Sequence, residues 1–149
     1  MAGLYFEEFS VGQTVTTLSR TVGEDSINAF AGLTGDYNQI HTDAEFAKNT
    51  PFGQRIAHGL LGLSVAVGLI MRTGLLEGTV IAFREIQEWK FVKPIYIGDT
   101  VHAVLTIAET KALPRIGGGA LIAHVEVRNQ SDETLQKGTL NLLVMSKPK

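Results

Sequence analysis

The chain has 149 residues, a length typical of one domain that buries its own core without staples. Its net charge of -2 at pH 7 lacks the basic excess that binding to phosphate backbones requires, so we expect no nucleic-acid partner. No cysteine is present, which excludes disulfides, thiolate metal sites and cysteine nucleophiles. Acidic residues stand where a signal peptide carries its positive region, so we expect no signal peptide. We therefore expect one cytoplasmic domain over residues 1–149.

The N-terminal third predicts a weak strand over residues 13–22 and then a helix. Gly23 precedes Glu24 and Asp25, acids that the helix dipole favours in a first turn, and Gly35 suits the left-handed position that ends a helix. Thr42-Asp43-Ala44-Glu45 has the capping-box pattern that starts another short helix. The loop over residues 36–41 is therefore expected to be held between two helix ends.

Residues 59–72 form the most apolar segment of the chain. A helix that spans a membrane needs roughly 20 apolar residues, and this run ends at Arg72 and contains three glycines. The segment is apolar all round, which is typical of a helix buried in a protein core. We expect a central core helix and no membrane partner.

From Thr79 onward the apolar residues recur with a period of two, which predicts strands. A glycine inside such a run often marks a bulge, and we assign one to Gly138. A fully apolar helix needs cover, and a curved antiparallel sheet can wrap around it, so the expected class is α+β. The predicted strands cover residues 81–92, 100–108, 121–128 and 134–145.

Asp36 and His41 are the strongest candidates for acid/base chemistry, because a carboxylate and an imidazole share one short, fixed loop. Their spacing alone also fits an ordinary turn with a polar histidine. Gly59 opens the apolar helix, where a free backbone N–H can stabilise negative charge. The loop and the start of the helix together predict an acid/base pair beside a donor that stabilises negative charge.

The wider pattern resembles the MaoC-like, or hydratase-2, family of (R)-specific enoyl-CoA hydratases and dehydratases. The usual family signature is Gly-Asp-x-Asn-Pro-(aliphatic)-His, followed later by His-Gly. The matching residues are Leu33-Thr34-Gly35-Asp36-Tyr37-Asn38-Gln39-Ile40-His41, Phe46-Ala47 and His58-Gly59.

This resemblance implies a hot dog fold, in which an antiparallel sheet wraps around a central helix. It implies that Asp36 and His41 activate the water that adds to an enoyl thioester, and that the Gly59 N–H binds the thioester oxygen. The implied reaction is (R)-specific hydration of trans-2-enoyl-CoA, or of the acyl-carrier-protein thioester, without a cofactor. The implied assembly is a homodimer or a higher homo-oligomer.

Other candidate residues have weaker support. Gln39 stands where the family has proline, and Val67 stands where some members carry a serine; Ser64 and His58 are possible pocket residues. Asn38 is expected to support the loop through its side chain. The four histidines lack ligand spacing, so we expect no metal site.

Two other functions fit a hot dog domain. Acyl-CoA thioesterases share the fold but lack the Asp-x-x-x-x-His pairing found here at Asp36 and His41. A non-catalytic module that binds acyl thioesters would differ only in the absence of turnover. A panel of enoyl and hydroxyacyl thioesters distinguishes the three.

Overall fold

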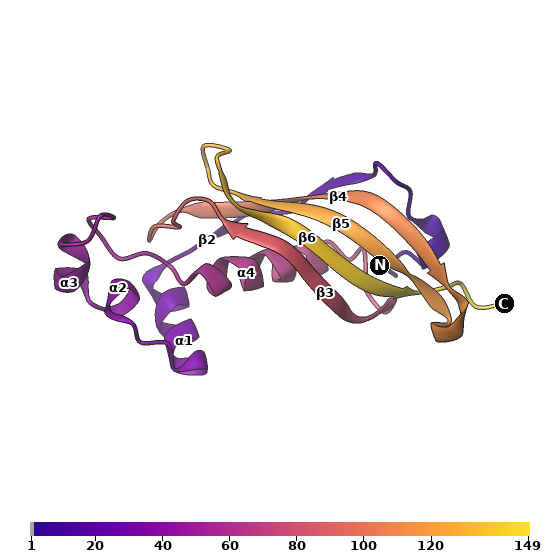
Figure 1. The fold of residues 1–149 in the computed structure, drawn as a ribbon, viewed down its shortest axis with the longest axis horizontal. Helices are drawn as coiled ribbons and strands as arrows, with labels where there is room; N and C mark the ends of the chain where they lie inside the picture. The colour runs from indigo at the N-terminus through magenta and orange to yellow at the C-terminus, as the bar shows by residue number, and fades with distance from the viewer. Residues whose placement is uncertain (1) are drawn as a thin grey trace.

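The computed structural model describes residues 2–149 as a curved antiparallel sheet that wraps around one long helix (Figure 1). The sheet order is β1-β4-β5-β6-β3, with β2 paired to β4 as well. The elements, in chain order, are η1 (Phe6–Glu8), β1 (Thr14–Thr16), β2 (Arg20–Thr21), α1 (Glu24–Thr34), α2 (Gln39–Thr42), α3 (Ala44–Lys48), α4 (Gly59–Met71), β3 (Val80–Phe91), β4 (Thr100–Leu113), η2 (Pro114–Ile116), β5 (Gly118–Arg128) and β6 (Thr134–Met145).

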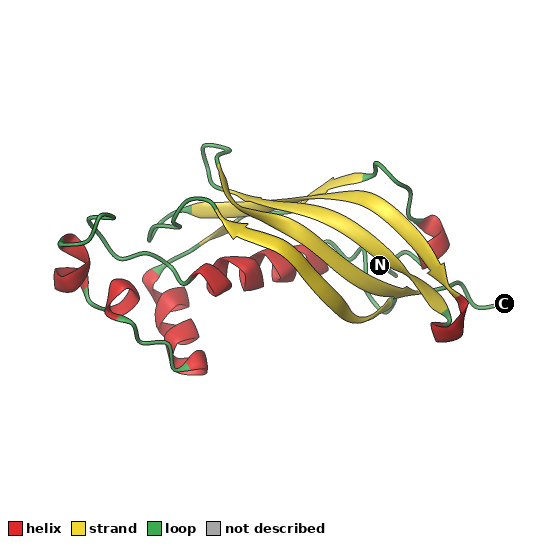
Figure 2. Cartoon of the chain, in the orientation of Figure 1, coloured by secondary structure: helices red, strands yellow, loops and turns green. Residues whose placement is uncertain are grey.

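The core lies between α4 and the concave face of the sheet. Buried residues of α4 such as Leu61, Ala66 and Ile70 share one apolar cluster with alternate residues of β4 and β5, among them Leu105 and Val125. This confirms the predicted architecture. Figure 2 shows the helices α1, α2 and α3 gathered beyond the start of α4, at the end of the molecule away from both termini. No helix within residues 2–149 has the length and apolar character needed to cross a membrane.

The predicted weak strand over residues 13–22 is divided into two short strands, β1 and β2, by residues 17–19. Both strands pair with β4. The hairpin between β4 and β5 is longer than predicted, because the strands extend to Leu113 and from Gly118. Only Gly117 of the glycine run has a left-handed φ, of 69°. Gly118 belongs to β5, where a Cβ would lie 2.0 Å from the carbonyl oxygen of Val144.

The bulge assigned to Gly138 lies on the neighbouring strand instead. Gln87 pairs with Thr139 and Lys90 with Lys137, so both Glu88 and Trp89 stand opposite Gly138. Glu88 has a φ of 51°, the left-handed conformation common in bulges. A Cβ on Gly138 would lie 2.6 Å from the Trp89 ring, so the glycine leaves room for the indole.

Candidate functional site

Asp36 follows α1, which ends as predicted at Gly35 with a left-handed φ of 80°. The Asp36 carboxylate accepts a hydrogen bond from the N–H of Asn38 (3.2 Å), and the Asn38 side chain accepts one from the N–H of Ile40 (3.2 Å). Asn38 is thus the N-cap of α2. Two successive side-chain-to-backbone turns therefore fix the carboxylate at the surface.

The loop predicted over residues 36–41 is shorter, because His41 lies on the single turn of α2. The predicted cap of the next helix is also displaced by one residue. Asp43, rather than Thr42, caps α3 and accepts from the N–H groups of Glu45 and Phe46. Thr42 instead donates to the carbonyls of Tyr37 and Asn38 (3.1 and 3.2 Å). One carboxylate oxygen of Asp43 accepts both bonds, whereas the hydroxyl of Thr42 is already engaged within its own turn.

The partner of His41 fixes its tautomer. Its Nδ1 lies 2.8 Å from the carbonyl oxygen of Ile56. A carbonyl can only accept, so Nδ1 carries the proton and donates. The neutral ring therefore keeps a lone pair on Nε2, the atom that can take a proton from a substrate or from water.

His58 is buried, with 2% of its surface exposed, rather than placed at a pocket edge. Its Nε2 lies 2.9 Å from the carbonyl oxygen of Asp36, so the same argument makes Nε2 the donor. The ring of His58 stacks on that of His41, with 4.0 Å between their centroids. The centroid of the Phe30 ring lies 4.8 Å from that of His58. His58 thus connects the Asp36 backbone to the face of His41.

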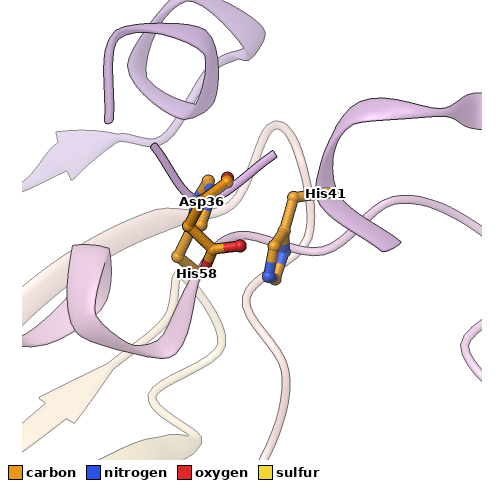
Figure 3. Close-up of side chains that lie close together, drawn as sticks. All are labelled: Asp36, His41 and His58. Atoms are coloured by element: carbon orange, nitrogen blue, oxygen red, sulfur yellow. The ribbon is translucent and has the colours of Figure 1, made fainter. Parts of the chain in front are cut away.

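Figure 3 shows that the Asp36 carboxylate points toward His41, with His58 beside both. One polar atom of each of these three side chains lies within 4.8 Å of the others. Two hydrogen bonds of about 2.8 Å that meet at one water span roughly 4.5 Å, which is a separation at which one water can bridge two polar atoms. His58 offers a metal no solvent-accessible lone pair, because its Nε2 donates to the carbonyl of Asp36 and its Nδ1 is buried. The geometry favours acid/base chemistry over metal binding.

Gly59 begins α4, and His58 at its N-cap makes no side-chain cap bond. Within residues 2–149 the N–H of Gly59 has no protein acceptor, as expected for the first turn of a helix. The positive end of the helix dipole adds to this donor. A Cβ at this position would lie 2.7 Å from the Phe91 ring, so any other residue would displace that ring from the start of α4.

A cavity of about 480 Å³ opens at this helix start. Its wall is mostly apolar, with His41 and Gln136 as polar members and Lys93 as a charged one. The full lining is His41, Phe52, Ile56, Ala57, Gly59, Leu60, Phe91, Val92, Lys93, Pro94, Ile95 and Gln136. An apolar cleft with a few fixed polar groups is the usual form of a small-molecule site.

Of the residues that the sequence suggested, His41 and Gly59 line the cavity, whereas Asp36, Asn38, His58 and Ser64 do not. Ser64 lines a separate depression with Phe30 and Leu33 of α1, and does not reach the cavity that holds His41. Lys93 lines the cavity but pairs with Glu133 at 2.5 Å. Sequence reasoning missed Gln136 and Phe91. The one available signal concerned Gln136, a polar residue within the predicted strand over residues 134–145.

Comparison with known proteins identifies the family. The model of the MaoC like domain matches residues 7–131. An (R)-specific enoyl-CoA hydratase of Rhodospirillum rubrum is 38% identical over 103 residues, which are 69% of this chain and 69% of the relative. Protein MaoC of Klebsiella aerogenes is 37% identical over 102 residues, 68% of this chain but only 30% of the longer relative.

A solved structure agrees with this assignment. The crystal structure of a monoamine oxidase regulatory protein from Archaeoglobus fulgius superimposes with a TM-score of 0.92 at 36% identity. The match covers 99% of this chain and 98% of that chain. The family match, the curated relatives and the arrangement of the sheet around α4 agree, so this chain belongs to the MaoC-like family and has the hot dog fold.

Proposed function

We propose that this protein is a hydro-lyase that hydrates trans-2-enoyl thioesters reversibly to (R)-3-hydroxyacyl thioesters. The observation that carries the proposal is the open Nε2 of His41 beside the Asp36 carboxylate, at a helix start with a free N–H. Support also comes from the relative named (R)-specific enoyl-CoA hydratase. The acyl group is carried by coenzyme A or by an acyl carrier protein.

The proposed reaction assigns a step to each of these groups. A water held between Asp36 and His41 gives one proton to the pair as its oxygen attacks C3 of the enoyl group. The pair returns a proton to C2, so that H and OH add across the double bond and the thioester stays intact. The Gly59 N–H donates to the thioester oxygen, where negative charge develops in the transition state. One such donor contributes about 3 kcal/mol in other oxyanion holes.

The competing thioesterase would use the same donor but bring water to the carbonyl carbon. A short substrate such as crotonyl-CoA separates the two reactions. We expect loss of the conjugated-enoyl absorbance without release of free thiol, and (R)-3-hydroxybutyryl-CoA as the product. Release of thiol at the rate of substrate loss would favour the thioesterase, and absence of any turnover across the panel would favour the binding module. The (S) product would keep the reaction class and contradict the family's stereochemistry.

We further propose that the working form is a homodimer joined through β3. This strand ends the sheet order, so within residues 2–149 its outer edge pairs with no other strand. It also presents large apolar side chains to solvent: Ile81, Phe83, Ile86 and Phe91 are 39–55% exposed. An open edge with exposed apolar residues is a surface that proteins normally cover.

A further inference from the structure

Gln136 is a buried amide on the face of β6 that meets α4. Only 2% of its surface is exposed, and its neighbours in the core cluster are apolar. A buried amide without partners is costly, so its two ends should both be bonded. The structure meets this requirement with partners from two other elements.

Those partners allow only one orientation of the amide. The indole N–H of Trp89 donates to Gln136 Oε1 (3.2 Å), and Gln136 Nε2 donates to the carbonyl oxygen of Gly59 (3.0 Å). An indole N–H cannot accept and a backbone carbonyl cannot donate. The oxygen must therefore face Trp89, and the nitrogen must face the first turn of α4.

The surrounding backbone is shaped to admit this chain of contacts. A Cβ on Gly62 would lie 2.4 Å from Gln136 Nε2, so the glycine leaves the space that the amide occupies. The bulge in β3 and the bare Gly138 opposite it admit the Trp89 ring. Two glycines and a bulge thus leave the space for two hydrogen bonds that connect β3 through β6 to α4.

This connection ends at the residue whose N–H the proposed chemistry uses, on the carbonyl of the peptide group that follows that N–H. Gly59 carries the free N–H, its carbonyl accepts from Gln136, and both Gly59 and Gln136 line the cavity with His41. A second donor on that carbonyl resists rotation of the first turn and polarises the adjoining Leu60 peptide. A donor must be preorganised to favour the transition state over the ground state.

We propose that Gln136, anchored by Trp89, is a positioning residue that aims the first-turn N–H of α4 at the thioester oxygen. The inference rests on the proposed hydratase function. It predicts that Gln136→Met, which keeps most of the volume and removes the donor, lowers kcat by about tenfold or more while KM changes less than threefold. Asn141→Leu is the matched control, because Asn141 is another buried amide of β6 that does not line the cavity.

A pH profile separates donation from packing. In Gln136→Glu a carboxylate cannot donate to the Gly59 carbonyl, whereas the protonated acid can. The ratio of kcat for Gln136→Glu to kcat for Gln136→Met should therefore rise as the pH falls. His41 and Lys93 line the same cavity and His58 precedes Gly59, but all three are present in both variants and cancel in the ratio. A flat ratio, or wild-type kcat in Gln136→Met, overturns the proposal.

A spectroscopic measurement keeps the inference testable without turnover. Trp89 is the only tryptophan in the chain, so its fluorescence reports directly on the bond to Gln136. Gln136→Met should shift the Trp89 emission and the amide resonances of Gly59 and Leu60, and Asn141→Leu should leave both near their wild-type values. Unshifted signals in Gln136→Met overturn the positioning role even if crotonyl-CoA proves not to be a substrate. If Gln136→Met does not fold, the near-isosteric Gln136→Glu decides by the same signals at high pH.

Discussion

Asp36 and His41 are held in place by different kinds of contact. The backbone N–H of Asn38 fixes the Asp36 carboxylate, whereas His41 depends on the carbonyl of Ile56 and on the stacked ring of His58. The pair shares one proton-transfer task in the proposed reaction, so neither group is expected to work well alone. The effects of removing them should therefore not add.

Asp36→Asn and His41→Ala should each lower kcat/KM for crotonyl-CoA about 100-fold or more, because each removes half of the acid/base unit. The double variant should be little worse than the poorer single variant, since members of one catalytic unit are non-additive. Steady-state kinetics on variants checked by circular dichroism provide the measurement. A folded single variant with near-normal turnover would show that the assignment is wrong.

His58→Phe tests the connection between the two groups. Phenylalanine can still stack on His41 but cannot donate to the carbonyl of Asp36, so the loop loses one fixed contact. We expect turnover to fall about tenfold, because small misplacements of catalytic groups are costly. His124→Phe, on the exposed face of β5, is the control and should retain activity. Equal activity in the two variants would remove His58 from the positioning role.

The β5–β6 hairpin carries a charged cluster that links its two strands. Arg128 donates to Glu126 (2.8 Å), and the Thr134 hydroxyl donates to the other carboxylate oxygen (2.9 Å). These two bonds, the first from Arg128, lower the pKa of Glu126 below its ordinary value. The side chain is 39% exposed, so solvent screens the pair. Its contribution to stability is expected to be at most about 1 kcal/mol.

The sign of this contribution follows from the lowered pKa. A carboxyl whose pKa is lower in the folded state stabilises the protein above its unfolded pKa, about 4.3, and loses that effect as the pH falls through its folded value. Glu126→Gln should therefore lower Tm slightly at pH 7 and have no effect at acidic pH. Thermal melts of both proteins between pH 7 and pH 2.5 provide the measurement. A Tm difference that grows as the pH falls would contradict the assignment.

Within residues 2–149, no strand pairs with the outer edge of β3, the long strand at one end of the sheet. The exposed apolar side chains of β3 lie along this edge, and the strand also carries Phe91, which packs against Gly59 at the cavity. A second copy that pairs with β3 would cover these side chains and continue the sheet across two subunits. Assembly and the proposed site would then share one strand.

Ile86→Lys should convert the proposed dimer to a monomer, because a lysine on the edge strand would have to be buried against the partner. Val11→Lys is the control; Val11 is 64% exposed and precedes β1, at the opposite edge of the sheet. Light scattering over a dilution series provides the measurement. A wild-type protein that remains monomeric at tens of micromolar would contradict the proposal.

Features that depend on neighbouring residues were predictable from the amino-acid sequence. Period and capping chemistry placed α1, its end at Gly35, the all-apolar α4 and the run of strands. They also brought Asp36 and His41 into one short segment. Errors of one residue, such as the cap at Asp43, arise because adjacent residues compete for the same N–H groups.

The contacts at the start of α4 were not predictable from local sequence, because they join residues that are distant along the chain. Gln136 and Gly59 are 77 positions apart, and their contact depends on the register of β6 and on a bulge in β3 that no local pattern revealed. The burial of His58 likewise follows from the packing of α1 and α2 on either side of it. Local periodicity identifies which face of a strand is apolar, but a contact across the sheet is set by the strand pairings between the two residues.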